Sequence, residues 1–205
     1  MERMNAMNVN NDFRSARHWA HALIEETLEI GDIAVDATMG NGHDTEWLCR
    51  LVGETGRVYA FDIQPAAVAQ TEARLQGAQL RNRAILHCAG HERMSELLPE
   101  SANAIVFNLG WLPGAPHGVT TRVETTLQAA NAALQCLKPR GILTICIYPG
   151  HEEGARERDA LLHWGAHLRP EAFDVFVKQY LNQPHDPPLL LAVRKLMEKT
   201  STGLP

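Results

Sequence analysis

Two carboxylates flank a glycine-rich turn with a spacing suited to holding a nucleotide. The first is Asp36, in the run Asp36-Ala37-Thr38-Met39-Gly40-Asn41-Gly42, and the second is Asp62, 20 residues beyond Gly42. Two glycines separated by one residue allow a tight turn and a close approach of the backbone to a ligand. A carboxylate about 20 residues further on is suited to accept hydrogen bonds from ribose hydroxyls.

The charge of this loop favours a cationic cofactor. A dinucleotide fingerprint needs a third glycine, where this chain has Thr45, and Asp36 would repel a pyrophosphate. S-adenosylmethionine carries a sulfonium and an ammonium, and it suits the loop better. The residues predicted to bind it are Asp36, Thr38, Gly40, Asn41, Gly42, His43, Asp44, Asp62, Gln64, Gly90, His91 and Asn108. The alternative is that the glycines only turn the chain and that Asp62 only caps a helix.

A second loop carries residues that could act on an amine. It begins Asn108-Leu109-Gly110-Trp111, and the Asn108 oxygen could accept an N–H while the Trp111 indole stacks on a base. The predicted catalytic residues are Asn108, Trp111, His117, Tyr148 and His151. A histidine among them could take a proton from a substrate ammonium. Equally, Asn108 could simply end a strand and Trp111 could be a core aromatic.

We predict no metal site. His43, His117, His151 and Asp44 come from separate loops and lack the spacing of metal ligands.

These loops must be positioned by alternating strands and helices. Strands are predicted over 33–38, 57–63, 83–89, 104–110, 142–148, 173–181 and 189–196, and helices over 14–30, 44–52, 66–76, 121–137 and 152–168. This alternation predicts a doubly wound, Rossmann-like α/β fold with a mainly parallel sheet. The last two strands are joined by only 182–188, too short for a crossover helix, so we expect them to be antiparallel.

Length and composition place limits on the protein. Its 205 residues suit one domain over 1–205, with 1–12 a loose tail, and 45% hydrophobic residues can form a core. A net charge of −5 excludes a protein that coats nucleic acid by bulk positive charge. The first residues lack the apolar stretch of a signal peptide, and the four cysteines form no CxxC pair and no zinc spacing. We therefore expect a cytoplasmic protein with reduced thiols and no membrane span.

Four motifs in this order resemble one bacterial family. DATMGNGHDT, FNLGWLPGAPH, YPGH and NQPHDPP are similar to motifs of the YtqB-like rRNA methylases, over about Val35 to Lys195. The resemblance implies a class I S-adenosylmethionine-dependent methyltransferase with a seven-stranded sheet whose last strand is antiparallel. Members of the MnmM type methylate tRNA: they convert 5-aminomethyl-2-thiouridine at the wobble position into 5-methylaminomethyl-2-thiouridine.

The resemblance implies tRNA, through its anticodon loop, as the substrate. RNA phosphates would meet some of Arg74, Arg81, Arg83, Arg93, Arg122, Arg156 and Arg158, although a solvated helix face is the alternative for each. Two other functions stay open: methylation of rRNA, a small molecule or a protein amine on the same fold, and a binding module that holds the cofactor without catalysis. A homodimer would enlarge the RNA-binding surface of so small a domain.

Overall fold

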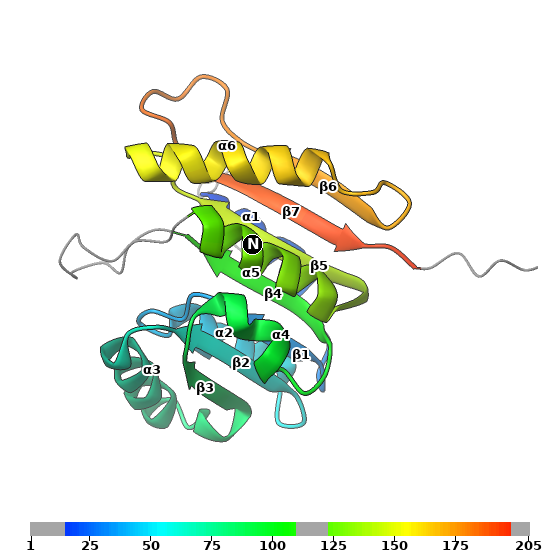
Figure 1. Cartoon of the computed structure of the whole chain (residues 1–205). Helices are drawn as coiled ribbons and strands as arrows, with labels where there is room; N and C mark the ends of the chain where they lie inside the picture. The colour runs from blue at the N-terminus through cyan, green and yellow to red at the C-terminus, as the bar shows by residue number, and fades with distance from the viewer. Residues whose placement is uncertain (1–14, 110–122, 198–205) are drawn as a thin grey trace, which may run out of the picture.

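A computed structural model describes residues 15–109 and 123–197, and its centre is a seven-stranded sheet of order β3-β2-β1-β4-β5-β7-β6 (Figure 1). Every pairing is parallel except those of β7, which runs antiparallel to both β5 and β6. The predicted doubly wound sheet and its antiparallel last strand are confirmed. The strands are β1 (Ile33–Asp36), β2 (Arg57–Asp62), β3 (Ala84–Cys88), β4 (Ala102–Asn108), β5 (Leu137–Ile147), β6 (Phe173–Lys178) and β7 (Leu189–Lys195).

Helices cover both faces of the sheet. They are α1 (Ala16–Glu25), α2 (His43–Val52), α3 (Pro65–Gly77), α4 (Met94–Leu97), α5 (Val123–Cys136) and α6 (Glu152–Ala166), with short 3-10 turns over Arg81–Arg83 and His91–Arg93. One face packs against α4, α5 and α6, and the opposite face against α1, α2 and α3. The central strands are therefore hydrophobic on both faces, as buried parallel strands must be.

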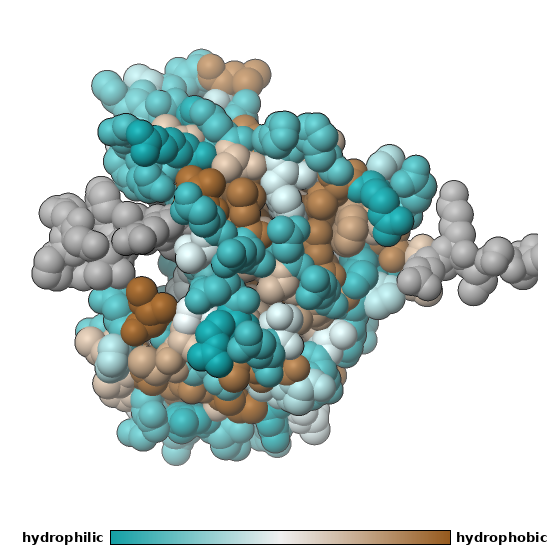
Figure 2. Space-filling view, in the orientation of Figure 1, coloured by the Kyte–Doolittle hydropathy of each residue, from teal (hydrophilic) through white to brown (hydrophobic). Residues whose placement is uncertain are grey.

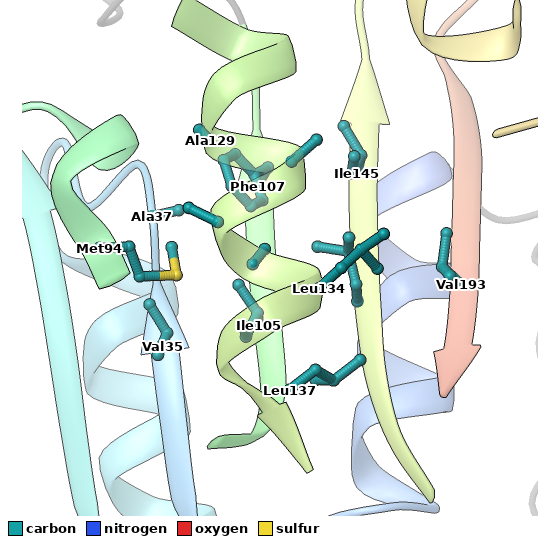
Figure 3. Close-up of a cluster of buried hydrophobic side chains, with 14 of the residues drawn as sticks. Val35, Ala37, Met94, Ile105, Phe107, Ala129, Leu134, Leu137, Ile145 and Val193 are labelled. Atoms are coloured by element: carbon teal, nitrogen blue, oxygen red, sulfur yellow. The ribbon is translucent and has the colours of Figure 1, made fainter. Parts of the chain in front are cut away.

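The larger core cluster lies between the sheet and α5 (Figure 3). Side chains alternate along β4, so that Ile105 and Phe107 enter this cluster while Ala104 and Val106 enter the one beneath α2. The two strands at the centre of the sheet, β1 and β4, are thus held rigidly from both sides. Asp36 and Asn108, the residues at the carboxyl ends of these strands, are therefore held in fixed positions.

Several elements differ from the prediction, and three of the differences are larger than the rest. Helix α1 ends at Glu25 instead of residue 30, because the backbone N–H of Thr27 turns back to the carbonyl of Ile24 and the chain leaves the helix. Strand β5 begins at Leu137, directly after α5, and includes residues 138–141, which lie between the predicted helix and the predicted strand. There Gly141 lies so close to the Asn103 carbonyl that a Cβ atom would be 2.9 Å from its oxygen. A single-turn helix, α4, lies between β3 and β4 and is not among the predicted helices.

The viewed face of the molecule is hydrophilic over the outer sides of its helices, with hydrophobic residues showing mainly between them (Figure 2). Within 15–109 and 123–197, no helix is long and apolar enough to cross a membrane.

Candidate active site

The candidate site lies where the strand order of the sheet reverses, between β1 and β4. Asp36, Asp62 and Asn108 are the last residues of β1, β2 and β4, which are neighbours in the sheet. Parallel strands end at the same edge, and ligands of such sheets bind beyond that edge. The structure therefore brings the glycine-rich loop and Asn108, the residue that begins the second loop, to the same edge of the sheet.

The glycine-rich loop after β1 is held in one shape by its own backbone and by α3. Gly40 and Gly42 have φ of +48° and +76°, a region that favours glycine. At Gly42 a Cβ atom would lie 2.7 Å from Thr71 Oγ1. The Thr71 hydroxyl donates to the Gly40 carbonyl at 3.0 Å, and Arg74 Nε donates to the Asn41 carbonyl at 2.7 Å. The turn is thus preorganised, and its glycines are required by both conformation and space.

Asp36 is a buried carboxylate at the floor of this loop. Its side chain is 1% exposed and accepts hydrogen bonds from the Thr38 N–H at 3.1 Å and from Thr45 Oγ1 at 2.6 Å. Burial raises the pKa of Asp36 to about 7, and the negative charge of Asp44 adds to that rise. A nearby cation would favour the ionised form, so this carboxylate is suited to a positively charged ligand.

Asp62 closes the loop from β2. Its carboxylate accepts hydrogen bonds from the Gly40 N–H at 3.1 Å and from the Gln64 N–H at 2.9 Å. Gln64 itself is the residue that precedes α3, and its side chain makes no capping hydrogen bond there. Asp62 is therefore fixed at the end of β2, the position predicted for a ribose-binding carboxylate.

Asn108 is anchored at both its backbone and its side chain. Its N–H donates to Thr38 Oγ1 at 2.8 Å, and its Nδ2 donates to a carboxylate oxygen of Asp44. Its Oδ1 is buried and has no hydrogen-bond partner among the residues that the structure describes. The side chain thus presents one unused acceptor whose orientation is set by its other end.

Asp44 is the most heavily hydrogen-bonded acid of the site. Its Oδ1 accepts from Arg17 Nε at 2.9 Å, Arg17 Nη2 at 2.6 Å and His21 Nε2 at 2.8 Å. Burial of the carboxyl works to raise the pKa of Asp44, but the hydrogen bonds from His21 and Arg17 outweigh it and keep that pKa below its ordinary value. Asp44 therefore remains an anion beside Asn108.

Neither Arg17 nor His21 was predicted from the sequence. Both lie on α1, before the first strand, where no motif marks them. The available signal was their spacing of four residues on a helix whose other face, with Trp19, Ala20 and Ile24, is buried.

The remaining predicted residues surround this centre. His91 Nδ1 donates to the Ala37 carbonyl at 3.2 Å, and burial lowers the pKa of the His91 ring. Gly90 immediately precedes the 3-10 turn that His91 begins. His43 is the first residue of α2, and its Nε2 lies 3.2 Å from Arg74 Nη2. All three lie in the connections that follow the carboxyl ends of β1 and β3 or at the start of the helix that comes next.

Tyr148 and His151 follow β5. Burial raises the pKa of Tyr148 to about 12, so the phenol keeps its proton at neutral pH. His151 precedes α6, and its Nδ1 accepts a hydrogen bond from the Gly154 N–H at 3.0 Å. That bond occupies the lone pair of the ring nitrogen that a neutral histidine would use as a base. Trp111 and His117 lie outside the described residues, so their catalytic roles stay predictions.

The arginines predicted to meet RNA phosphates are already engaged. Those within the described ranges, which exclude Arg122, form ion pairs at distances between 2.6 and 3.9 Å: Arg74 with Glu46, Arg81 with Glu72, Arg83 with Glu54, Arg93 with Glu96, Arg156 with Glu152 and Arg158 with Asp186. Any contact of these arginines with a phosphate must compete with a carboxylate. In the same ranges no three His, Cys, Asp or Glu side chains gather in a way that could hold a metal ion.

The site fits a bound S-adenosylmethionine. Asn41 Oδ1 is a buried acceptor without a partner among the described residues, and an N–H donor of the cofactor would satisfy it. Asp36 suits the positive charge of the cofactor, and Asp62 suits hydroxyl donors. The tight backbone at Gly40 and Gly42 suits close approach of a ligand.

The fold and the site together define a class. A seven-stranded sheet of this order, with β7 antiparallel and a carboxylate, a glycine turn and a second carboxylate at the reversal, belongs to a class I S-adenosylmethionine-dependent methyltransferase. A crystal structure from Clostridium thermocellum, described as a "putative rRNA-methylase", matches with a TM-score of 0.88 and 38% identity, over 90% of this chain and 99% of that one. A "putative methyltransferase" from Streptococcus mutans in complex with SAH matches with a TM-score of 0.82 and 35% identity, over the same shares.

The family follows from the sequence comparisons. The profile of the family described as "Putative rRNA methylase" matches residues 58–194. A curated protein of Arabidopsis thaliana, the chloroplastic tRNA (mnm(5)s(2)U34)-methyltransferase, is 34% identical over 192 residues, covering 89% of this chain and 70% of that protein. The chain belongs to this rRNA methylase family, as its motifs indicated.

Proposed function

We propose that this methyltransferase acts on tRNA and methylates the aminomethyl group of 5-aminomethyl-(2-thio)uridine at the wobble position, giving 5-methylaminomethyl-(2-thio)uridine. The name of the Arabidopsis relative supports this substrate. The observation that carries the proposal is the unused, buried Oδ1 of Asn108, whose amide is oriented by Asp44. Such an acceptor suits a nucleophile with N–H donors, which a primary amine has and a ring carbon lacks.

The residues assigned to the cofactor divide the work. Asp36 and Asn41 would face its cationic, amine-bearing part, Asp62 its ribose hydroxyls and His91 its base. When bound, S-adenosylmethionine supplies an electrophilic methyl carbon on a positively charged sulfur. Asn108 Oδ1 would accept one N–H of the substrate amine and direct its lone pair at that carbon.

The proposed reaction moves one methyl group, and its positive charge, from sulfur to nitrogen. The amine lone pair forms the N–C bond as the S–C bond breaks, and the sulfur keeps the electron pair of the broken bond and becomes neutral. The new secondary ammonium then releases one proton. Because the methyl donor is already activated, positioning and exclusion of water supply most of the acceleration.

The wobble nucleotide is accessible without unwinding a helix. It lies unpaired in the anticodon loop, so it can be turned out and stacked on an aromatic residue at small cost. Trp111 is the predicted stacking residue. The homodimer and the cytoplasmic location also stay predictions, and the Arabidopsis relative is described as chloroplastic.

The test supplies labelled cofactor with four acceptors: tRNA lacking the terminal methyl group, rRNA, a small alkylamine and no acceptor. Nucleoside mass spectrometry then locates the label. We expect methylation only in tRNA, at the wobble uridine. Labelling of rRNA or of the free amine alone would support those substrates instead, and cofactor binding without labelling of any acceptor would contradict the proposal.

A further inference from the structure

A hydrogen-bonded network connects helix α1 with the candidate catalytic asparagine. Arg17 and His21, four residues apart on α1, both donate to Asp44 Oδ1, and the other oxygen of Asp44 accepts from Asn108 Nδ2. In the sequence, Asp44 is 27 positions from Arg17, 23 from His21 and 64 from Asn108. The Asp44 side chain is 9% exposed, so the network is shielded from water at its centre.

The ionised Asp44 decides which way the Asn108 amide points. A carboxylate only accepts hydrogen bonds, so the amide must turn its NH2 group toward Asp44. The opposite orientation would set the Asn108 oxygen against a carboxylate oxygen and leave the NH2 group without this acceptor. The backbone N–H of Asn108 donates to Thr38 Oγ1 at 2.8 Å, and this hydrogen bond fixes the Asn108 backbone. Both ends together leave Oδ1 with a single direction.

Helix α1 keeps Asp44 charged and in place. Burying a lone carboxylate is costly, and the Arg17 and His21 donors offset that cost. The His21 ring stacks on Trp47 of α2 with centroids 3.8 Å apart and an angle of 11° between planes. Trp47 Nε1 in turn donates to Glu25 Oε1 at 3.3 Å. Helices α1 and α2 are thus clamped together around the Asp44 carboxylate.

We propose that Asp44, held by Arg17 and His21, is the positioning residue that orients the Asn108 amide so that its oxygen meets the substrate amine. The proposal rests on the proposed function, because it assigns Asn108 Oδ1 to an amine N–H. It adds that α1, which precedes the first strand, is part of the catalytic apparatus. Asp44 then acts through Asn108 and does not itself contact the reacting atoms.

The first test is Asp44→Asn, which keeps the shape of the side chain. Its oxygen would be retained by the Arg17 and His21 donors, so its NH2 group would face Asn108 and force the Asn108 amide to reverse. We expect kcat to fall about a hundredfold, the cost of misplacing one reacting partner, with cofactor Kd changed less than threefold. A kcat within twofold of wild type would overturn the proposal.

The second test uses Arg17, whose side chain is 42% exposed, so that its replacement removes little buried surface. We expect Arg17→Met to lower kcat at least tenfold and Arg17→Lys to restore part of it. The matched control is Arg50→Met. Arg50 lies on α2, is 59% exposed and pairs with Glu46 of the same helix at 2.7 Å. The control is expected to keep wild-type kcat. Equal losses in Arg17→Met and Arg50→Met would contradict a specific role for α1.

The pH profile separates positioning from a general loss of structure. The groups around Asp44 are Arg17 and His21 from α1, Asp36 from β1, and Cys146 and Tyr148 at the end of β5. Removing the Arg17 charge raises the pKa of Asp44, so the acidic limb of kcat in Arg17→Met should move to higher pH than in the wild type. A uniform loss of kcat at every pH would indicate a merely structural role and overturn the proposal.

A measurement without substrate keeps this inference distinct from the proposed function. In ¹⁵N-labelled protein, the Asn108 side-chain NH2 resonance is assigned by its loss in Asn108→Ala. It should move in Asp44→Asn and Arg17→Met and stay in place in Arg50→Met. If wild-type protein methylates no tRNA while this resonance behaves as expected, the proposed function fails and the network stands. An unmoved resonance in both variants refutes the network even in an active enzyme.

Discussion

The buried carboxylate Asp36 predicts that cofactor affinity depends on pH in the physiological range. Burial, then the charge of Asp44, raises its pKa from 3.8 to about 7. A cationic ligand binds the ionised form, so the proton must leave before or during binding. With a pKa of about 7, about nine-tenths of Asp36 is ionised at pH 8 and about one-tenth at pH 6.

The magnitude follows from this proton loss. The apparent Kd is multiplied by one plus the ratio of protonated to ionised Asp36, a factor of about 11 at pH 6 and about 1.1 at pH 8. Affinity for S-adenosylmethionine should therefore fall about tenfold, or about 1.4 kcal/mol, between pH 8 and pH 6. In Asp36→Asn this contribution disappears, and affinity at pH 8 falls toward the wild-type value at pH 6.

Isothermal titration calorimetry at pH 6, 7 and 8 checks this, with Asp32→Asn as the matched control. Asp32 lies just before β1, at the opposite end of the strand from the site, so its variant should keep the wild-type slope. The reasoning is refuted if wild-type affinity changes less than twofold over this range, or if Asp36→Asn keeps the same slope. The raised pKa of Asp36 also makes the free energy of unfolding depend on pH. Its contribution to stability is complete below about pH 4 and is lost as the pH rises toward 7. In Asp36→Asn, the free energy of unfolding should therefore decline less over this range.

Two further predictions concern the glycine-rich turn and the separate roles of Asn108 and Asp62. In Gly42→Ala, alanine would have to adopt a φ of +76° with its Cβ 2.7 Å from Thr71 Oγ1, so the free energy of unfolding should fall by about 2 kcal/mol and Tm by about 6 °C. In Gly77→Ala, where a Cβ meets nothing within 4 Å, Tm should stay the same or rise. An unchanged Tm in Gly42→Ala would contradict the argument from space. Asn108→Ala should collapse kcat with cofactor Kd intact, and Asp62→Ala should weaken Kd first; matching losses of kcat and Kd in both variants would mean that their roles are assigned wrongly.

The cofactor loop could be predicted because its signals are local. A carboxylate, two glycines and a second carboxylate at the ends of two strands are fixed by turn chemistry and by strand order. The contacts of Asp44 with helix α1 could not be predicted in this way, because they join residues far apart in the sequence. Asp44 was predicted only as a cofactor residue, since nothing nearby in the sequence shows that Arg17 and His21 reach it across 27 and 23 positions.

The arginines predicted to meet RNA phosphates show the same limit. Composition and sequence identify arginines, but pairing depends on what the fold brings beside them. Arg74 meets Glu46 from another helix, and Arg158 meets Asp186 from the loop between β6 and β7. The start of β5 was also hidden, because Gly141 and its neighbours look like a turn until β4 is placed beside them.

The most direct test of the central claim uses two anticodon stem-loops that differ in one nucleotide. One carries 5-aminomethyl-2-thiouridine at the wobble position, and its partner carries uridine there. With saturating S-adenosylmethionine, we predict that the enzyme adds one methyl group to the aminomethyl nitrogen of the first and none to the second. Methylation of both stem-loops, or of the first at any atom other than that nitrogen, would contradict the account.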